Sequence, residues 1–203
     1  MAEYQFKDSM EEFSYSLGLT ISSNLMQSGV NKIDTLQFLA GFQDNFAGNT
    51  PRISMDEANQ IIQEFMLAHN EDEAVRNLEE GLLYLSNNIN NEGVKETESG
   101  LQYKILKDGY GESPTIDDHI KCHYHGILLD GNVFDSSIER KQAAVFPVNA
   151  VVEGWQEALL MMKVGAKWRL FIPSDLAYGD QGAAGLIGPN ATLIFDVELL
   201  EIV

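Results

Sequence analysis

The chain has 203 residues, which is enough for one large domain or two small ones, and its 44% hydrophobic residues can form a folded core. With 31 Asp and Glu against 13 Lys and Arg, its net charge is -18, so we expect no nucleic-acid partner and no anionic membrane surface as partner. The single cysteine excludes an internal disulfide, and no apolar run reaches the roughly 18 to 20 residues of a membrane span.

The N-terminal segment gives an expectation about location. The first 30 residues contain no basic stretch followed by an apolar one, so no signal peptide is visible. We therefore expect a cytoplasmic protein. The alternative is a periplasmic protein whose signal peptide was removed and replaced by a new Met.

Two short helices are predicted in the first 50 residues. In the first helix, apolar residues recur every four positions and form one face: Phe13, Leu17, Ile21 and Leu25. The second helix follows Asp34, which has the capping-box spacing to Gln37, and Gly48 is the expected end. Its apolar positions, at helical spacing, are Leu36, Leu39, Phe42 and Phe46.

A long third helix is predicted over residues 54–92. It begins at a second capping box, Ser54 with Glu57, and could run about 37 residues, or about 55 Å. Its apolar seam alternates steps of three and four: Val75, Leu78, Leu82, Leu85 and Ile89. The seam fits either a helix lying on its own domain or a solvated connecting stalk that meets other helices, and the surface charge favours the stalk.

The helical half has more apolar residues than so small a unit can bury. They include Phe13, Phe38, Phe42, Phe46, Phe65 and Met66. A segment of about 50 residues has a marginal core of its own, so a second copy of the chain would have to supply the rest. We therefore predict that residues 1–68 form a homodimerisation module.

From residue 95 onward the sequence predicts an α+β domain, 95–203, with an antiparallel sheet on a short helix. Strands are expected at 101–106, 120–126, 167–173 and 193–199, and Asp130-Gly131 marks a hairpin. Ile194 breaks the alternation of the last strand. The short helix is expected at 155–162, after Gly154.

We find no sequence motif for a nucleophile, a phosphate-binding loop or a metal. Cys122 lies near His123 and His125, but on a strand the two histidines face away from the thiol. A two-histidine metal site would need a third ligand from His119, Asp117 or Asp118. Buried, hydrogen-bonded strand histidines are the simpler interpretation, so we predict no metal and no cofactor.

Aromatic residues are the conspicuous feature of this half, and singly each fits a β core. The strings that contain them are 133–137 (VFDSS), 152–159 (VEGWQEAL), 172–179 (IPSDLAYG) and 191–200 (ATLIFDVELL). They strongly resemble the FKBP-type peptidyl-prolyl isomerases, and the match covers about 99–203. The front half, with Ser14-Tyr15-Ser16-Leu17-Gly18 and 97–103 (TESGLQY), resembles the bacterial Mip-like 22-kDa subgroup.

The resemblance implies a site that twists X–Pro bonds. Trp155 would form its floor, Phe134, Phe146 and Phe195 its walls, and Asp135 would orient Tyr124. The Val152 amide and the Tyr178 hydroxyl would bind substrate carbonyls. The other implied substrate-binding residues are Val151, Leu186 and Ile187.

The flap of the implied site departs from the family. Many relatives have His at the position of Ala183 and Pro at that of Gly188, and Ala183-Ala184-Gly185 makes a smaller flap. These departures affect the expected substrate preference and leave the expected reaction unchanged.

The resemblance also implies partners. The chain would pair with a second copy in a V-shaped homodimer. It would act on unfolded or partly folded proline-containing proteins, and it would bind macrolide inhibitors of the rapamycin type. The alternative functions are a proline-recognising chaperone without catalysis and a non-enzymatic assembly protein.

Overall fold

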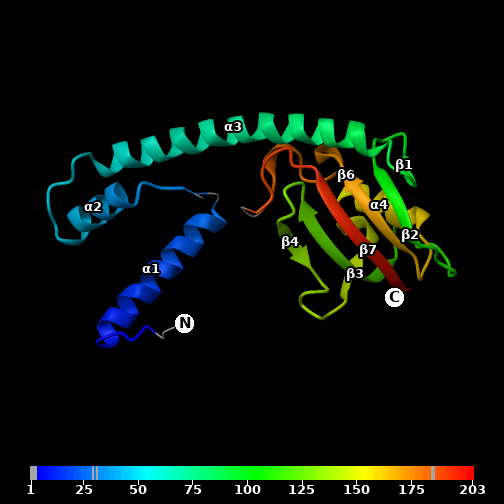
Figure 1. Ribbon diagram of the computed structural model, residues 1–203, viewed down its shortest axis with the longest axis horizontal. Helices are drawn as coiled ribbons and strands as arrows, with labels where there is room; N and C mark the ends of the chain where they lie inside the picture. Colours follow the sequence, from blue (N-terminus) through cyan, green and yellow to red (C-terminus); the bar gives the residue numbers. More distant parts are fainter. Residues whose placement is uncertain (1–3, 29, 31, 184–185) are drawn as a thin grey trace. The chain divides into compact units, whose positions relative to one another are not determined.

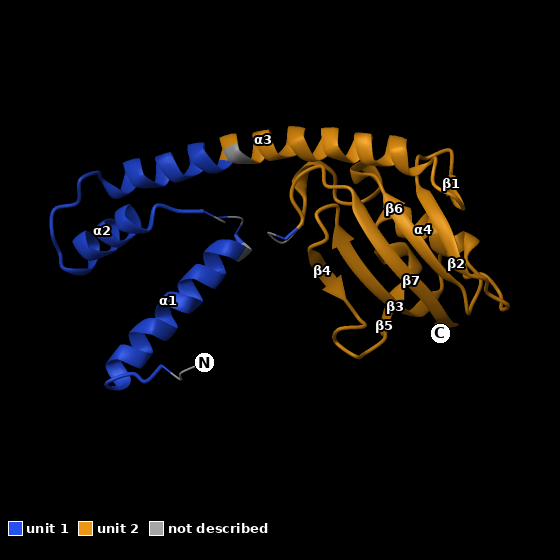
Figure 2. Cartoon of the chain, viewed as in Figure 1, with its two compact units in different colours: residues 1–66, 184–186 blue, residues 67–183, 187–203 orange. Residues whose placement is uncertain are grey.

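The computed structural model describes residues 4–28, 30, 32–183 and 186–203. It divides the chain into an N-terminal unit, residues 1–66 with 184–186, and a C-terminal unit, residues 67–183 with 187–203 (Figure 2). Within the described ranges, none of the helices has both the length and the apolar composition needed to cross a lipid bilayer.

Helix α1 spans Ser9–Gln27 (Figure 1) and begins after the N-cap residue Asp8. The Asp8 carboxylate accepts a hydrogen bond from the Glu11 amide at 2.8 Å, and the Glu11 carboxylate accepts one from the Lys7 amide at 2.7 Å. The Glu11 amide is one of those that a helix start leaves without intrahelical partners, and the bond to Asp8 satisfies it. The predicted first helix is confirmed.

The second and third helices begin where their capping patterns predict. Asp34 accepts hydrogen bonds from the Leu36 and Gln37 amides at 3.0 and 3.1 Å, and helix α2 spans Thr35–Phe46. Gly48 follows with φ +69°, a left-handed conformation that favours glycine. Ser54 accepts a hydrogen bond from the Glu57 amide at 3.1 Å and starts helix α3, Met55–Asn88.

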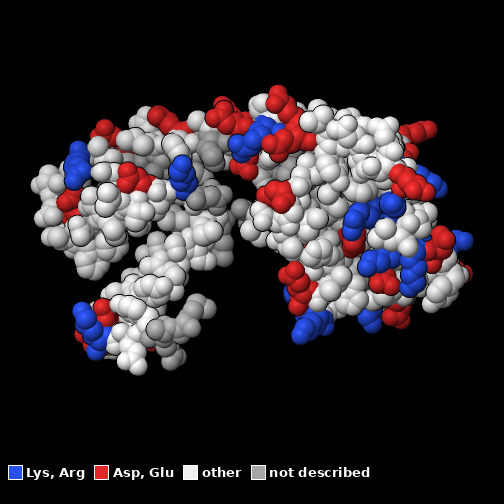
Figure 3. Space-filling view, viewed as in Figure 1, with Lys and Arg blue, Asp and Glu red and all other residues white. Residues whose placement is uncertain are grey.

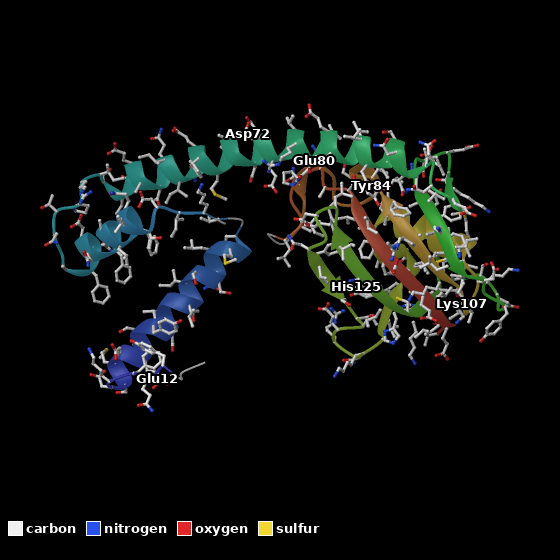
Figure 4. The ribbon with its side chains drawn as sticks, in the orientation of Figure 1. Glu12, Asp72, Glu80, Tyr84, Lys107 and His125 are labelled. Carbon is white, nitrogen blue, oxygen red and sulfur yellow. The ribbon has the colours of Figure 1, made fainter. Side chains whose placement is uncertain are left out.

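Helix α3 has 34 residues and ends four positions before the predicted boundary at 92. The Asn90 side chain donates to the Ser86 carbonyl at 3.1 Å, which satisfies one of the acceptors left free at the helix end. Gly93, at φ +80°, then turns the chain into the first strand. Exposed acidic side chains, Asp72 and Glu80 among them, lie along this helix (Figures 3 and 4).

The C-terminal unit contains a seven-stranded antiparallel sheet with the order β1-β2-β6-β7-β3-β4, in which β5 also pairs with β3. The strands are β1 Val94–Glu96, β2 Gln102–Lys107, β3 His119–Leu128, β4 Val133–Ser136, β5 Ala144–Pro147, β6 Lys167–Ile172 and β7 Leu193–Ile202. The four predicted strands and the β3–β4 hairpin, where Gly131 has φ +88°, are confirmed. Strands β1 and β5, of three and four residues, were not predicted because they are too short to show an alternating pattern.

One face of the sheet packs against helix α4, Glu153–Met161. Ala158 and Leu159 are fully buried in the main core. Gly154 allows the close approach of helix and sheet, since a Cβ at this position would lie 2.5 Å from Cγ2 of Ile172. This helix is the expected short helix at 155–162, displaced by about one residue at its end.

The opposite face of the sheet carries a second, smaller core beneath the C-terminal part of α3. Leu85 packs there with Phe171 and Ile194, and the Tyr84 and Phe171 rings lie 6.1 Å apart (Figure 4). This contact explains why Ile194 interrupts the alternation in β7: both faces of the sheet are buried at that position.

The seam predicted along α3 is therefore only partly correct. Val75, Leu78 and Leu82 are exposed, and Leu85 is buried against the sheet. Residues 67–88 belong to the C-terminal unit, and Leu85 lies on its sheet as the first interpretation had it, whereas the exposed Val75, Leu78 and Leu82 fit the second, the solvated stalk.

A buried polar network joins the end of α3 to β2. The Gln102 side chain, 1% exposed, donates to the Leu85 carbonyl at 2.9 Å and accepts a hydrogen bond from the Asn88 amide group at 2.9 Å. It also donates to the Glu96 carboxylate at 2.7 Å. Because buried amides are costly to leave unpaired, this network fixes the helix end on the sheet.

Candidate functional site

Five aromatic side chains from β3, β4, β5, α4 and β7 form one connected cluster on the α4 side of the sheet. They are Tyr124, Phe134, Phe146, Trp155 and Phe195. Spread over 72 positions in the sequence, they meet because β3 pairs with β4, β5 and β7. We call this set the aromatic cluster.

Trp155 lies at the centre of the aromatic cluster. Its ring makes edge-to-face contacts with Tyr124 at 5.4 Å, Phe195 at 5.1 Å and Phe146 at 6.3 Å between centroids. Phe134 contacts Phe195 in the same manner at 5.2 Å. Such geometry is the preferred one for aromatic pairs and holds each ring in a fixed orientation.

The aromatic cluster reaches the protein surface on one side. Tyr124, Trp155 and Phe195 are buried, whereas Phe134 and Phe146 are only partly buried. The buried Nε1 of Trp155 has no hydrogen-bond partner among the described residues. An unpaired buried donor costs about 1–3 kcal/mol, so this arrangement is not the one that stability alone would select.

Gly126 provides the space for two of the rings. It lies on β3 opposite Phe195 and Asp135, and a Cβ there would lie 2.6 Å from Phe195 and 2.7 Å from Phe134. The sequence analysis missed this residue, and a glycine inside an alternating strand is the signal that could have found it.

Asp135 orients Tyr124, as the resemblance implies. The Tyr124 hydroxyl donates to the Asp135 carboxylate at 2.5 Å. The Arg140 guanidinium forms an ion pair with the same carboxylate and donates to the Tyr124 hydroxyl at 2.7 Å, with its charge 5.6 Å from the Tyr124 ring. The sequence analysis missed Arg140, which lies in an exposed turn where spacing gives no signal.

Tyr124, Asp135 and Arg140 each have one defined protonation state at neutral pH. Burial, reinforced by the bond to Asp135, raises the pKa of Tyr124 to about 12. Burial alone would raise the pKa of Asp135, but the hydrogen bonds from Tyr124 and Arg140 outweigh it and lower that pKa below its ordinary value. The aromatic cluster therefore contains a neutral phenol, which is bonded to a carboxylate held by a cation, and neither the phenol nor the carboxylate titrates near pH 7.

The remaining residues of the implied site fall into two groups. Val151, Val152 and Ile187 pack in or against the main core that contains the aromatic cluster. The Val152 amide, at the start of α4, donates to no other described residue, and the Gln156 side chain fixes the Val151 carbonyl at 2.7 Å. Tyr178 and Leu186 are exposed, and the Tyr178 hydroxyl has no described partner.

The alternative sites around Cys122 are not supported. Burial raises the pKa of the Cys122 thiol to about 12, so it is no thiolate nucleophile. His123 and His125 instead lie within 3.1 and 3.0 Å of the hydroxyls of Ser137 and Ser136. In the described part of the chain, no three His, Cys, Asp or Glu side chains gather as metal ligands would.

The C-terminal unit is an antiparallel sheet on one short helix with the aromatic cluster between them, and comparisons with known proteins identify its family. Residues 111–200 match the family model "FKBP-type peptidyl-prolyl cis-trans isomerase", and residues 10–105 match "Domain amino terminal to FKBP-type peptidyl-prolyl isomerase". The chain belongs to the FKBP-type peptidyl-prolyl cis-trans isomerase family. The predicted family, enzyme class and fold are confirmed.

Individual relatives cover nearly the whole chain. The FKBP-type 22 kDa peptidyl-prolyl cis-trans isomerase of Escherichia coli is 43% identical, over 93% of each chain. Peptidyl-prolyl cis-trans isomerase Mip of Coxiella burnetii is 40% identical, over 97% of this chain and 88% of its own. The crystal structure of FkpA from Escherichia coli, 35% identical, covers 98% of both chains with a TM-score of 0.68.

Proposed function

We propose that the aromatic cluster binds the proline ring of a polypeptide substrate and catalyses rotation about the preceding peptide bond. The observation that carries the proposal is the connected set of rings, three buried and two partly exposed, with the ordered Tyr124–Asp135 pair beside it. In this site Trp155 is the floor, and Phe134, Phe146 and Phe195 are the walls.

The polar groups around the cluster suit a substrate backbone. The unpaired amide of Val152 and the free hydroxyl of Tyr178 are donors for two substrate carbonyls. Val151, Leu186 and Ile187 would contact the substrate's flanking residues. Asp135 keeps Tyr124 in place and presents its carboxylate near the rotating bond.

The reaction needs few polar groups because no atom is transferred. Amide resonance produces a rotation barrier of about 18–20 kcal/mol, while the two isomers of an X–Pro bond differ by only about 0.5–1 kcal/mol. The planar amide is more charge-separated than the twisted one, so an aromatic site that removes water from its carbonyl disfavours the planar state. Each 1.36 kcal/mol removed from the barrier gives a tenfold faster rotation.

A competition assay tests this assignment. We expect the full-length protein to accelerate cis–trans exchange of a short proline peptide in a protease-coupled assay, and a macrolide of the rapamycin type to abolish the acceleration competitively. Catalysis that persists at saturating macrolide would place the active site elsewhere. Macrolide binding without any catalysis would instead support the alternative, a proline-recognising chaperone.

We propose further that the N-terminal unit is a homodimerisation module. None of the described residues between 4 and 66 is fully buried, although large apolar side chains are frequent there. Exposed members include Phe13, Leu17, Leu36, Leu39, Phe42 and Phe46. An apolar surface of this density is typical of an interface, since soluble monomers rarely leave so many large apolar side chains together in water.

Sedimentation equilibrium checks the dimer. At micromolar concentration we expect about twice the 22.6-kDa chain mass. Phe42→Glu, which adds a charge to the apolar face of α2, should shift the equilibrium toward monomer by more than tenfold, whereas Gln43→Glu at the neighbouring exposed position should not. A wild-type chain that stays monomeric would contradict this proposal.

The cellular location stays a prediction. A cytoplasmic protein was expected, and one relative, 35% identical, is named "Outer membrane protein MIP". That name supports the alternative, a location outside the cytoplasm. In either location, the dimer would bind unfolded or partly folded proline-containing proteins and act on them as a chaperone-like catalyst.

A further inference from the structure

The loop between η3, Gly179–Gln181, and β7 connects helix α3 to the proposed site. Within it, Ala183 and Ile187 form a two-residue antiparallel bridge: the Ala183 amide donates to the Ile187 carbonyl at 2.8 Å, and the reverse bond is 3.0 Å. Ile187 is 7% exposed and packs in the core that contains the aromatic cluster. Ala184 and Gly185, part of the smaller flap noted in the sequence, lie outside the described residues. The flap's second half, residues 186–192, is called the flap arm below.

One face of α3 holds the flap arm. The Asn77 side-chain amide donates to the Pro189 carbonyl at 2.8 Å, and the Asn190 side chain donates to the Ala74 carbonyl at 3.4 Å. Asn190 has φ +55°, a left-handed conformation uncommon outside glycine, and its own amide donates to the Gly179 carbonyl at 2.8 Å. The flap arm is thus tied on one side to the helix and on the other to the turn after Tyr178.

The flap arm approaches the same helix face closely at Gly188. A Cβ at Gly188 would lie 2.9 Å from Cδ of Glu73 and 3.0 Å from Nδ2 of Asn77. One helical turn further along, a Cβ at Gly81 would lie 3.3 Å from Cβ of Thr192, so helix and flap arm are in contact from Glu73 to Gly81.

We propose that Asn77 is a positioning residue for the isomerase site, holding the flap arm so that Ile187 stays packed beside the aromatic cluster. The proposal rests on the proposed site, because Ile187 matters for substrate only if substrate binds there. Asn77 would act through Pro189, two residues along the chain from Ile187. Helix α3 would then help to position the isomerase site, in addition to linking the C-terminal unit to the N-terminal unit.

The physical consequence is an effect on substrate affinity. A flap arm released from α3 samples more conformations, and substrate binding must then restore the one in which Ile187 is packed. The apparent affinity falls with the population of that conformation, while the rotation step at the aromatic cluster keeps its geometry. Loss of one partly buried hydrogen bond corresponds to a change of about threefold to tenfold.

The test uses the full-length chain with Asn77→Ala. Its matched control is Asn87→Ala, an exposed asparagine on the same helix. We expect KM for a short proline peptide to rise about threefold to tenfold with kcat unchanged within twofold, and the control to match the wild type. Hydrogen exchange of the Ile187 amide should become faster by a similar factor, while the Val197 amide in the centre of the sheet stays protected.

A second pair of variants tests the same contact by another route. Gly188→Ala should raise KM because the new Cβ meets the side chains of Glu73 and Asn77, and adding Glu73→Ala should restore it in part by removing the nearer of the two contacts. An unchanged KM and unchanged Ile187 exchange in Asn77→Ala would overturn the inference. So would equal losses in exchange protection at Ile187 and Val197, which would show a merely structural role.

The two proposals fail separately in this experiment. A wild-type protein without isomerase activity would overturn the proposed site and leave the exchange measurement to decide whether α3 holds the flap arm. An active wild type whose KM does not respond to either variant pair would leave the site standing and overturn the role of Asn77.

Discussion

A fragment of residues 67–203 should isomerise a short proline peptide nearly as fast as the full chain and yet be at least about a hundredfold poorer in catalysing proline-limited refolding of a whole protein. In the proposed site a short peptide would occupy only the aromatic cluster, which lies within this fragment. An unfolded protein can contact two sites of a dimer and its apolar helical surface at once. Such linkage raises apparent affinity by about 10²–10⁴ without new contacts at either site.

The fragment begins at residue 67 because α3 is part of the folded C-terminal unit. Leu85 is buried under the sheet, and the buried Gln102 would lose its bonds to Leu85 and Asn88 in a fragment of the predicted domain 95–203. We expect that shorter fragment to be less stable than 67–203. Circular dichroism of both fragments measures the difference in melting temperature.

Full-length variants provide the control for truncation. Phe42→Glu should lose refolding activity as the fragment does, with its peptide activity intact, and Gln43→Glu should retain both. Equal losses on the peptide and the protein substrate would mean that the N-terminal unit only stabilises the catalytic domain. No loss on either would show that this unit has another function.

Phe134→Ala should lower kcat/KM for the peptide by about tenfold to a hundredfold. The substitution removes a wall of the aromatic cluster and admits water to the amide that the site must keep dry, and each tenfold corresponds to 1.36 kcal/mol of barrier. Phe134 is only partly buried, so the protein should remain folded, whereas Trp155→Ala in the buried centre would also cost about 3–5 kcal/mol of stability.

Two further variants are compared with Phe134→Ala, one expected to have no effect and one expected to have a smaller effect. Val133→Ala, at the neighbouring exposed position on β4, should leave activity within twofold. Tyr178→Phe keeps the ring and removes one hydroxyl donor, so it should cost less than Phe134→Ala, about the 0.5–1.5 kcal/mol of one hydrogen bond. The protease-coupled rates, with circular dichroism as a check of folding, decide the order. Equal activity of folded Phe134→Ala and Val133→Ala would refute the site assignment.

The sequence by itself determined the local structure of this protein. Helix starts at Asp34 and Ser54 were predictable because capping is a contact between neighbours in the chain, and the hairpin at Gly131 because a tight turn requires a positive φ. The resemblance to the family supplied the residues of the aromatic cluster and the Tyr124–Asp135 pair, which spacing within one segment did not indicate. The geometry of the aromatic cluster could not be predicted from the spacing of its residues in the sequence.

Tertiary structure decided what lies between segments distant in the chain. Ile194 interrupts the alternating pattern of β7 because α3 covers the second face of the sheet at this position. Arg140 pairs with Asp135 because the fold brings the turn after β4 back to the strand, and its spacing in the sequence does not indicate the pair. Gly126 must be a glycine because aromatic rings from two other strands occupy the space beside it. Such requirements arise from close packing between elements, and the periodicity of one segment does not contain them.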